Sequence, residues 1–108
     1  MTDEYTLYED LGSLVDAIQS DSIVSRTFYK DDQLRAILFG FDAGQELSEH
    51  TSSQTAVIHI IEGEARVSLG EHTHDLEPGS WVHMLPNLKH SIYAKTPVKM
   101  ILLMLGKG

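Results

Sequence analysis

Two stretches of this sequence decide how the chain folds: GQELSEHTSSQTAVIHIIEG at residues 44–63 and GSWVHMLPNLKH at residues 79–90. Each opens with a glycine and holds a histidine at a set distance, His50 after five intervening residues and His90 after ten. The residues between the two stretches include the Gly and Pro positions that favour tight turns. This arrangement predicts an all-β domain built of short hairpins.

Most of the chain beyond residue 20 has the sequence pattern of β-strands. Runs of about five to nine residues rich in Val, Ile, Phe, Tyr and Thr alternate with turn residues. The expected strands are residues 23–29, 34–41, 55–62, 65–69, 72–76, 81–85, 90–94 and 98–105. Short strands at hairpin spacing fit a double-sheet jelly roll, which protects its strand edges better than an open sheet does.

The first 20 residues have a different pattern. Apolar residues recur at helical spacing within residues 10–20, with Asp10 available as an N-cap, which predicts one short helix. Gly12 in the first turn weakens that helix, so the alternative is an extended arm lying across the barrel. We therefore divide the chain into an N-terminal arm or short helix, residues 1–20, and a barrel, residues 21–108.

Composition indicates one small domain and excludes several kinds of partner. The chain has 108 residues, and its 16 acidic and 8 basic residues give a formal charge of −8, which repels a phosphate backbone. No run approaches the roughly 18 apolar residues of a membrane span. We expect neither a nucleic acid nor a membrane as partner. Cysteine is absent and the N-terminus lacks the features of an export signal, so cytoplasm is the expected location.

The spacing within residues 44–63 resembles the first motif of the cupin family, Gly-x5-His-x-His-x3,4-Glu-x6-Gly. Gly44, His50 and Gly63 match that motif, whereas Ser52 stands at its second histidine and Ala56 at its glutamate. The second cupin motif, Gly-x5-Pro-x-Gly-x2-His-x3-Asn, matches residues 79–90 at the first glycine and the histidine only. The resemblance covers residues 42–105. It implies a small single-domain cupin, an RmlC-like jelly roll, with a degenerate first motif.

The resemblance also implies a site inside the barrel. Metal-binding cupins hold one divalent metal with the three histidines and the glutamate of these motifs, and only His50 and His90 carry over to this chain. Two imidazoles fall short of the three protein ligands usual for catalytic zinc or iron. His83 is the best replacement third ligand. The metal itself stays open between iron, zinc, nickel and manganese, and the alternative is a hydrogen-bonded histidine pair without metal.

Further polar and aromatic residues are candidate contacts for a small molecule. Ser52 and Gln54 lie in the loop after His50, and Trp81 and Tyr93 are the aromatic residues nearest to the second motif. The remaining histidines are expected outside the site. His59 should face away from the barrel interior by strand alternation, and the His72/His74 pair should be exposed in the intervening hairpin.

The last expected strand, VKMILLML at residues 98–105, is apolar on both faces after Lys99. Its outward face needs cover, and a second copy of the chain would supply it. We expect a homodimer that buries at least about 1,200 Å². The alternative is that the N-terminal segment covers this face.

These observations favour a cupin barrel that binds a small molecule, either through the histidines directly or through a divalent metal held by the reduced histidine set. The alternative is a metal-dependent enzyme, such as a dioxygenase, isomerase or lyase, with a replacement third ligand. A third class is a partner-binding dimer without any ligand. Catalytic residues are not assigned, since neither a nucleophile elbow nor a phosphate-binding loop is present.

Overall fold

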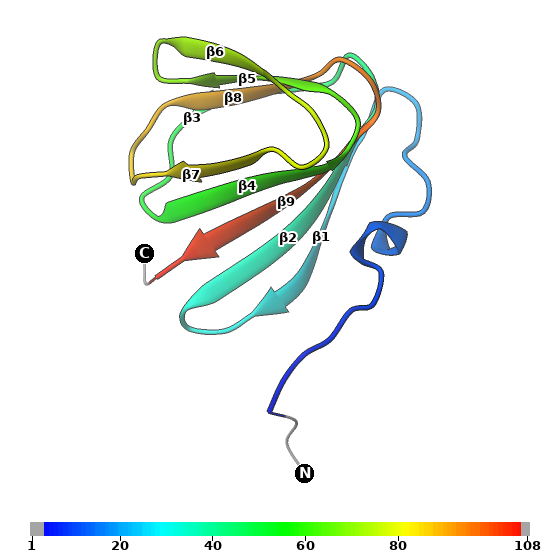
Figure 1. Ribbon diagram of the computed structural model, residues 1–108, viewed down its shortest axis with the longest axis vertical. Helices are drawn as coiled ribbons and strands as arrows, with labels where there is room; N and C mark the ends of the chain where they lie inside the picture. Colours follow the sequence, from blue (N-terminus) through cyan, green and yellow to red (C-terminus); the bar gives the residue numbers. More distant parts are fainter. Residues whose placement is uncertain (1–3, 107–108) are drawn as a thin grey trace.

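The protein forms a jelly roll of two antiparallel sheets that face each other (Figure 1). The structure is a computed structural model that describes residues 4–106, and nine strands lie within them. The strands are β1 (Ile23–Lys30), β2 (Leu34–Phe41), β3 (Glu46–His50), β4 (Thr55–Glu62), β5 (Ala65–Leu69), β6 (His72–Leu76), β7 (Trp81–Met84), β8 (His90–Ala94) and β9 (Val98–Leu105). Sheet A has the order β1-β2-β9-β4-β7, and sheet B has the order β3-β8-β5-β6. The all-β class expected from the sequence is confirmed.

Eight strands agree with the expected ranges to within one residue at each end, but β3 was not predicted. Its sequence, ELSEH, is polar, and every side chain except that of Leu47 is exposed. Strand prediction from alternating apolar residues therefore has no signal in this segment. The omission matters because β3 carries His50.

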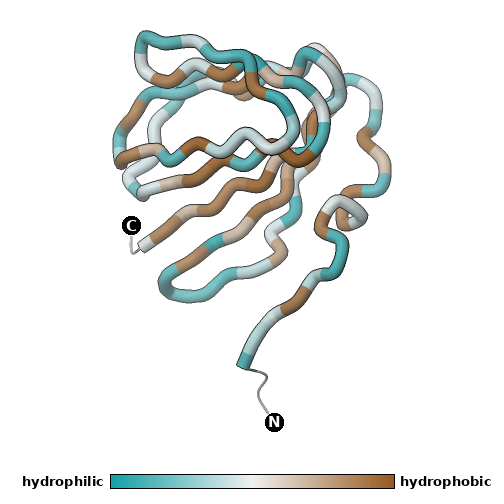
Figure 2. Tube along the Cα trace, in the orientation of Figure 1, coloured by the Kyte–Doolittle hydropathy of each residue, from teal (hydrophilic) through white to brown (hydrophobic). Residues whose placement is uncertain are grey.

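One hydrophobic core lies between the inward faces of the two sheets. Its largest members include Phe41, Ile58, Ile60, Val67, Ile92 and Met100, each no more than 2% exposed. Figure 2 shows the hydrophobic residues concentrated along β2, β4 and β9 of sheet A. Burying each large side chain contributes about 1.5–3 kcal/mol, so the contact between the sheets is the main source of stability.

The N-terminal segment is an extended arm with a single helical turn, which is the second of the two alternatives expected for it. Only Leu11–Leu14 form a 3-10 turn, and the side chain of Asp10 makes no capping hydrogen bond. Gly12 lowers helix stability at this point. Figure 1 shows the arm running beside sheet A. Residues 1–3 of the predicted arm lie outside the described residues, and no helix in residues 4–106 is long and apolar enough to cross a membrane.

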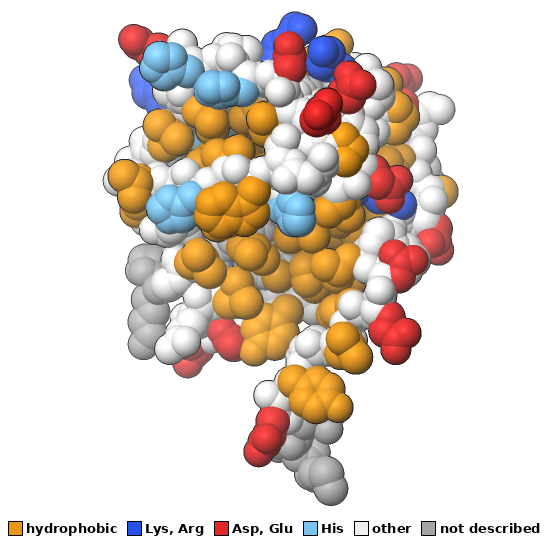
Figure 3. Space-filling model, in the orientation of Figure 1, with side chains coloured by type: hydrophobic (Ala, Val, Ile, Leu, Met, Phe, Trp, Pro, Cys, Tyr) orange, Lys and Arg blue, Asp and Glu red, His pale blue; other side chains and the backbone are white. Residues whose placement is uncertain are grey.

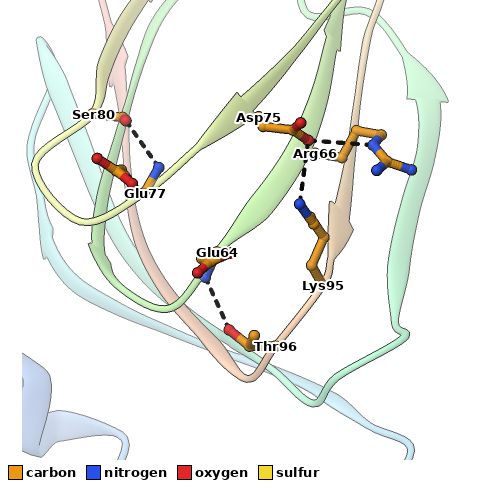
Figure 4. Close-up of polar contacts among 7 residues, drawn as sticks. All are labelled: Glu64, Arg66, Asp75, Glu77, Ser80, Lys95 and Thr96. Carbon is orange, nitrogen blue, oxygen red and sulfur yellow. Dashed lines mark hydrogen bonds and ion pairs between the residues drawn. The ribbon is translucent and has the colours of Figure 1, made fainter.

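Hydrogen bonds between turns close one end of the barrel (Figure 4). The Glu64 amide donates to Thr96 Oγ1 at 2.9 Å, and the Lys95 amide donates to the Glu64 carbonyl at 2.9 Å. Asp75 adds ion pairs to Arg66 at 3.3 Å and to Lys95 at 3.6 Å. Because Arg66 and Asp75 are largely exposed, their ion pair contributes little, and the turn hydrogen bonds provide most of the closure.

Gly63 is the residue that this closed end can least replace. Its φ is +82°, and a Cβ there would lie 1.9 Å from the Pro97 carbonyl oxygen. We expect Gly63→Ala to lower the free energy of unfolding by at least about 3 kcal/mol, because backbone strain and a backbone clash act together. Gly79→Ala is the matched control, since φ is +97° there but the space is open, and it should cost only about 1–2 kcal/mol. Equal losses in urea titrations of the two variants would contradict the clash.

Candidate functional site

His50 and His90, called the histidine pair below, meet across the ladder between β3 and β8. The two residues are direct partners in the register of this antiparallel pair. Their ring centroids are 4.2 Å apart, and the ring planes are inclined by 59°. The fold therefore brings together the two histidines that the motifs singled out.

A β-bulge turns His50 towards the barrel interior. Leu47 packs against the core opposite Ile92, and regular alternation would point a residue three positions later to the other face. The register shifts between Leu47 and His50, and the extra residue restores the inward direction. His90 faces inward without such help, because it alternates with the core residues Ile92 and Ala94.

Backbone carbonyls set the tautomer of both rings. Nδ1 of His50 lies 2.8 Å from the Ser48 carbonyl oxygen, and Nδ1 of His90 lies 2.8 Å from the Leu88 carbonyl oxygen. A carbonyl oxygen only accepts hydrogen bonds, so each Nδ1 carries the proton and donates it. The neutral rings then keep their Nε2 lone pairs free. Both imidazoles therefore offer an acceptor or metal-ligating nitrogen on the side opposite to the backbone.

The histidine pair lies at the open mouth of the barrel rather than deep inside it. His90 is only 6% exposed, whereas His50 is exposed to solvent. Three partly buried leucines border the pair: Leu69 is the partner of His90 on β5, and Leu47 and Leu88 also pack against the core. The mouth thus combines two imidazoles with an apolar wall.

Ser52 and Gln54 have structural partners in the loop after β3. The backbone carbonyl of Ser52 accepts a hydrogen bond from the Asn87 amide at 2.7 Å. The Ser52 hydroxyl accepts one from the Gln54 amide at 3.1 Å. Gln54 Nε2 donates to the Gly106 carbonyl at 2.9 Å, at the end of β9. Ser52 thus joins the two loops beside the mouth, and the Gln54 amide group, expected to reach the mouth, is instead engaged with the C-terminal end of the barrel.

Asn87 explains one departure from the second cupin motif. It stands where that motif has a glycine, and its φ is +70°, in the left-handed region. Asn adopts this conformation more readily than most residues, so the backbone path is kept without glycine. The replacement affects no ligand.

His83 does not join the histidine pair, so the expected third ligand is not found there. Val82 and Met84 pack into the core, and the residues that alternate with them, Trp81 and His83, therefore point out of sheet A. The rings of Trp81 and His83 stack 6.3 Å apart on that outer face, where both side chains are exposed. Trp81, an expected ligand contact, is likewise directed away from the mouth.

The other candidates also lie outside the mouth. Tyr93 is 37% exposed and alternates with inward-facing residues of β8, so it is on the outer face of sheet B. His59 is on the outer face of sheet A, opposite Trp81, as strand alternation predicted. His72 and His74 are exposed on the edge strand β6, as expected.

A jelly roll with an inward-facing histidine pair at one mouth defines a double-stranded β-helix barrel. Residues 37–106 match the family model described as Cupin domain, and the chain belongs to the cupin family. A cupin superfamily protein from Desulfitobacterium hafniense has a TM-score of 0.85 at 24% identity, covering 99% of this chain and 95% of that one. A conserved protein of unknown function from Streptococcus pyogenes has a TM-score of 0.80 at 24% identity, covering 100% and 92%.

Enzymes occur among the similar structures as well. The DMSP lyase DddQ from Ruegeria pomeroyi has a TM-score of 0.74 at 21% identity, and the match covers 80% of this chain and 48% of that one. No curated protein matches the chain. At these identities the likeness shows a shared fold, so any activity must be argued from the site itself.

The donors present do not form the ligand set of the family's metal. The histidine pair supplies two Nε2 atoms, and Ala56, at the glutamate position, is buried in the core. Residues 4–106 contain no group of three or more His, Cys, Asp or Glu side chains that could hold a metal ion. A catalytic metal normally has at least three protein ligands, so the residues present do not fit one.

Two features of the site had not been identified from the sequence. The leucines that border the histidine pair were not singled out, although Leu69 and Leu88 each lie within a few residues of a turn or a motif histidine. The backbone carbonyls of Ser48 and Leu88 could not be identified from the sequence, because every residue has such a carbonyl. Their role depends on backbone geometry two residues before each histidine, which spacing alone does not reveal.

Two hollows lie away from the histidine pair. A groove of about 480 Å³ runs between the arm and the β1–β2 hairpin, and its walls include Tyr8, Phe28 and Leu103. A second hollow of about 490 Å³ lies beside Arg35 and Gln54. Neither is lined by His50 or His90.

The groove contains a tyrosine–carboxylate contact that stabilises the β1–β2 turn. The Tyr29 hydroxyl donates to Asp31 Oδ2 at 2.6 Å, and Asp31 Oδ1 accepts the amides of Gln33 and Leu34 at 2.8 Å each. The hydrogen bond from Tyr29, followed by the Gln33 amide, holds the pKa of Asp31 below its usual value. The same hydrogen bond and the carboxylate charge raise the pKa of Tyr29. The contacts within the β1–β2 turn thus account for both pKa shifts.

Removing the Tyr29 hydroxyl should raise the pKa of Asp31, because the carboxylate loses its strongest donor. Since the folded-state pKa of Asp31 is lowered, its contribution to stability is present above the unfolded-state pKa and is lost as pH falls through the folded-state pKa. Tyr29→Phe should therefore lose stability at neutral pH and approach wild type in acid. Carboxyl NMR titration measures the shift, with Tyr93→Phe as the control. An unchanged Asp31 titration would contradict the assigned cause.

The tautomer of the histidine pair can be observed directly. We expect long-range nitrogen–proton NMR spectra of the neutral protein to show protonated Nδ1 and bare Nε2 for His50 and His90, because both Nδ1 atoms face carbonyls. The exposed rings of His72 and His74 serve as references in the same spectra. Protonated Nε2 on either member of the pair would show that the carbonyl contacts do not control the tautomer.

Proposed function

We propose that this cupin binds a small molecule at the barrel mouth through the Nε2 atoms of the histidine pair. The observation that carries the proposal is the pair itself: two facing imidazoles whose Nδ1 atoms are already engaged with carbonyls. Engaged Nδ1 atoms hold the rings in place, so little side-chain entropy is lost on binding. The ring centroids lie 4.2 Å apart, so both rings are within reach of one polar group.

The chemistry of the pair favours a hydroxyl or carboxylate head. A neutral Nε2 accepts a hydrogen bond from a hydroxyl, and a ring that gains a proton there becomes a charged donor to a carboxylate. With centroids 4.2 Å apart, two positive rings would repel each other, so an anion is best met by one charged and one neutral ring. The pair can thus donate and accept at the same time.

The surroundings define the rest of the ligand. Leu47, Leu69 and Leu88 give the mouth an apolar wall, which suits a compact apolar body behind the polar head. A divalent metal would obtain only two nitrogens from the protein, so the ligand or water would have to complete its coordination. A metal-dependent enzyme needs a further protein ligand. We therefore propose binding rather than catalysis as the function.

The direct test uses amide NMR titrations with hexanoate, benzoate and benzyl alcohol as probes. We expect shifts confined to the mouth, on residues that flank His50 and His90, and at least a tenfold weaker affinity in His50→Ala/His90→Ala, which corresponds to about 1.4 kcal/mol. The matched control is His72→Ala/His74→Ala, which removes two exposed imidazoles from the same sheet and should bind like wild type. Equal binding by all three proteins would contradict the proposal.

Two further measurements complete the test. The double variant at the histidine pair should remain folded, because the β3–β8 ladder is formed by backbone groups that alanine keeps, and His50 is exposed. If it unfolds, the histidines are structural. Metal content of protein purified without a histidine tag, after loading with iron, nickel, manganese or zinc, separates the two binding modes. Stoichiometric metal lost in the double variant would establish the reduced metal site. Negligible metal in both, together with probe binding in the titrations, would establish direct binding.

A further inference from the structure

The outer face of sheet A is apolar, and the N-terminal arm covers only part of it. A Cβ at Gly40 would lie 2.9 Å from Val15 and 3.0 Å from Ile18, so the arm packs tightly at this position. Lys99 Nζ also donates to the Gly12 carbonyl at 2.9 Å. Leu38, on the same face, is completely buried. The arm thus protects the part of the face formed by β2 and the start of β9.

The remaining part, called the open face below, consists of the outward side chains of residues 57–59 of β4, of β7 and of the second half of β9. The strand registers place these side chains in two rows that cross the sheet, Leu103–Val57–His83 and Ile101–His59–Trp81, with Leu105 at the margin. All except Val57 are partly or largely exposed. Figure 3 shows hydrophobic side chains gathered over this side of the molecule, with histidines among them.

The open face carries no formal charge, unlike most of the surface. None of its seven side chains is an Asp, Glu, Lys or Arg, although the chain has 16 acidic residues and a net charge of −8. Trp81 is 61% exposed at one side of it. Charge depletion with exposed aromatic side chains is the composition typical of the centre of a protein interface. Two copies that meet here would avoid contact between their acidic surfaces.

The arm carries apolar side chains that its own barrel does not bury. Tyr5 is 77% exposed and Leu7 is 68% exposed, while Tyr8 packs against Phe28 with ring centroids 5.5 Å apart. The groove beside Tyr8 continues into the open face, because Leu103 belongs to both. A neighbouring copy therefore finds an apolar groove next to an apolar face.

We propose that the open face binds the open face of a second copy, and that Tyr5 and Leu7 of each arm pack against the partner. Trp81, at one side of the open face, is the most exposed aromatic side chain of this contact, with His59 and His83 beside it. The histidine pair lies on the other sheet, so ligand binding and dimerisation use separate surfaces.

Sedimentation equilibrium tests the proposal. We expect wild-type protein at micromolar concentration to have about twice the 12.1 kDa mass of one chain. Trp81→Glu should weaken the dimer at least 30-fold, the effect of losing an aromatic contact of about 2 kcal/mol. The control is Leu85→Glu, which places the same charge on a side chain that is 69% exposed in the loop after β7, and it should leave the dimer intact.

Two more variants separate the parts of the proposal. His83→Glu changes another exposed side chain of the open face. It replaces Trp81→Glu as the test variant if circular dichroism shows that Trp81→Glu does not fold. Tyr5→Ser/Leu7→Ser should weaken the dimer without changing the unfolding midpoint of the barrel. A monomeric wild type, or a dimer weakened equally by Leu85→Glu, would overturn the interface. A dimer unaffected by the arm variant would overturn the role of the arms.

Discussion

The contact between the inward faces of the two sheets is the constraint on which the rest of the structure depends. Every strand must present alternate side chains to that contact, and a chain of 108 residues has no second core to compensate for an error. At the closed end the constraint is strict, and Gly63 tolerates no side chain. At the mouth it relaxes, so that inward positions can hold His50 and His90 in place of apolar residues.

The same alternation explains what could be predicted from the sequence and what could not. Eight strands follow from apolar runs and turn residues, whereas β3 is polar and was found only in the structure. The face of His83 stayed open in the sequence, and the structure places it on the outer side because Val82 and Met84 pack into the core. Tyr93 faces outward for the same reason, because it alternates with the inward-facing Ile92 and Ala94. The bulge before His50 leaves no such trace, since it changes the direction of a side chain without a characteristic residue.

The degenerate motifs keep the backbone of a cupin site while losing much of its chemistry. Asn87 preserves a left-handed turn where the motif has glycine, and Ser52 joins two loops where the motif has a histidine. Ala56 has become part of the core. The positions that shape the chain are thus retained more fully than the positions that would bind a metal. A barrel of this kind can keep a binding mouth after the donors for a metal have been reduced to two.

The bulge between Leu47 and His50 has a consequence for how such a mouth is gained or lost. Removing a single residue there would restore regular pairing with β8 and turn the His50 imidazole to the outside of the sheet. Both histidines would remain in the sequence, yet they would no longer face each other. A change in length of one codon can therefore abolish the site in a descendant whose residue composition looks intact, and comparison of residue identities alone would miss the event.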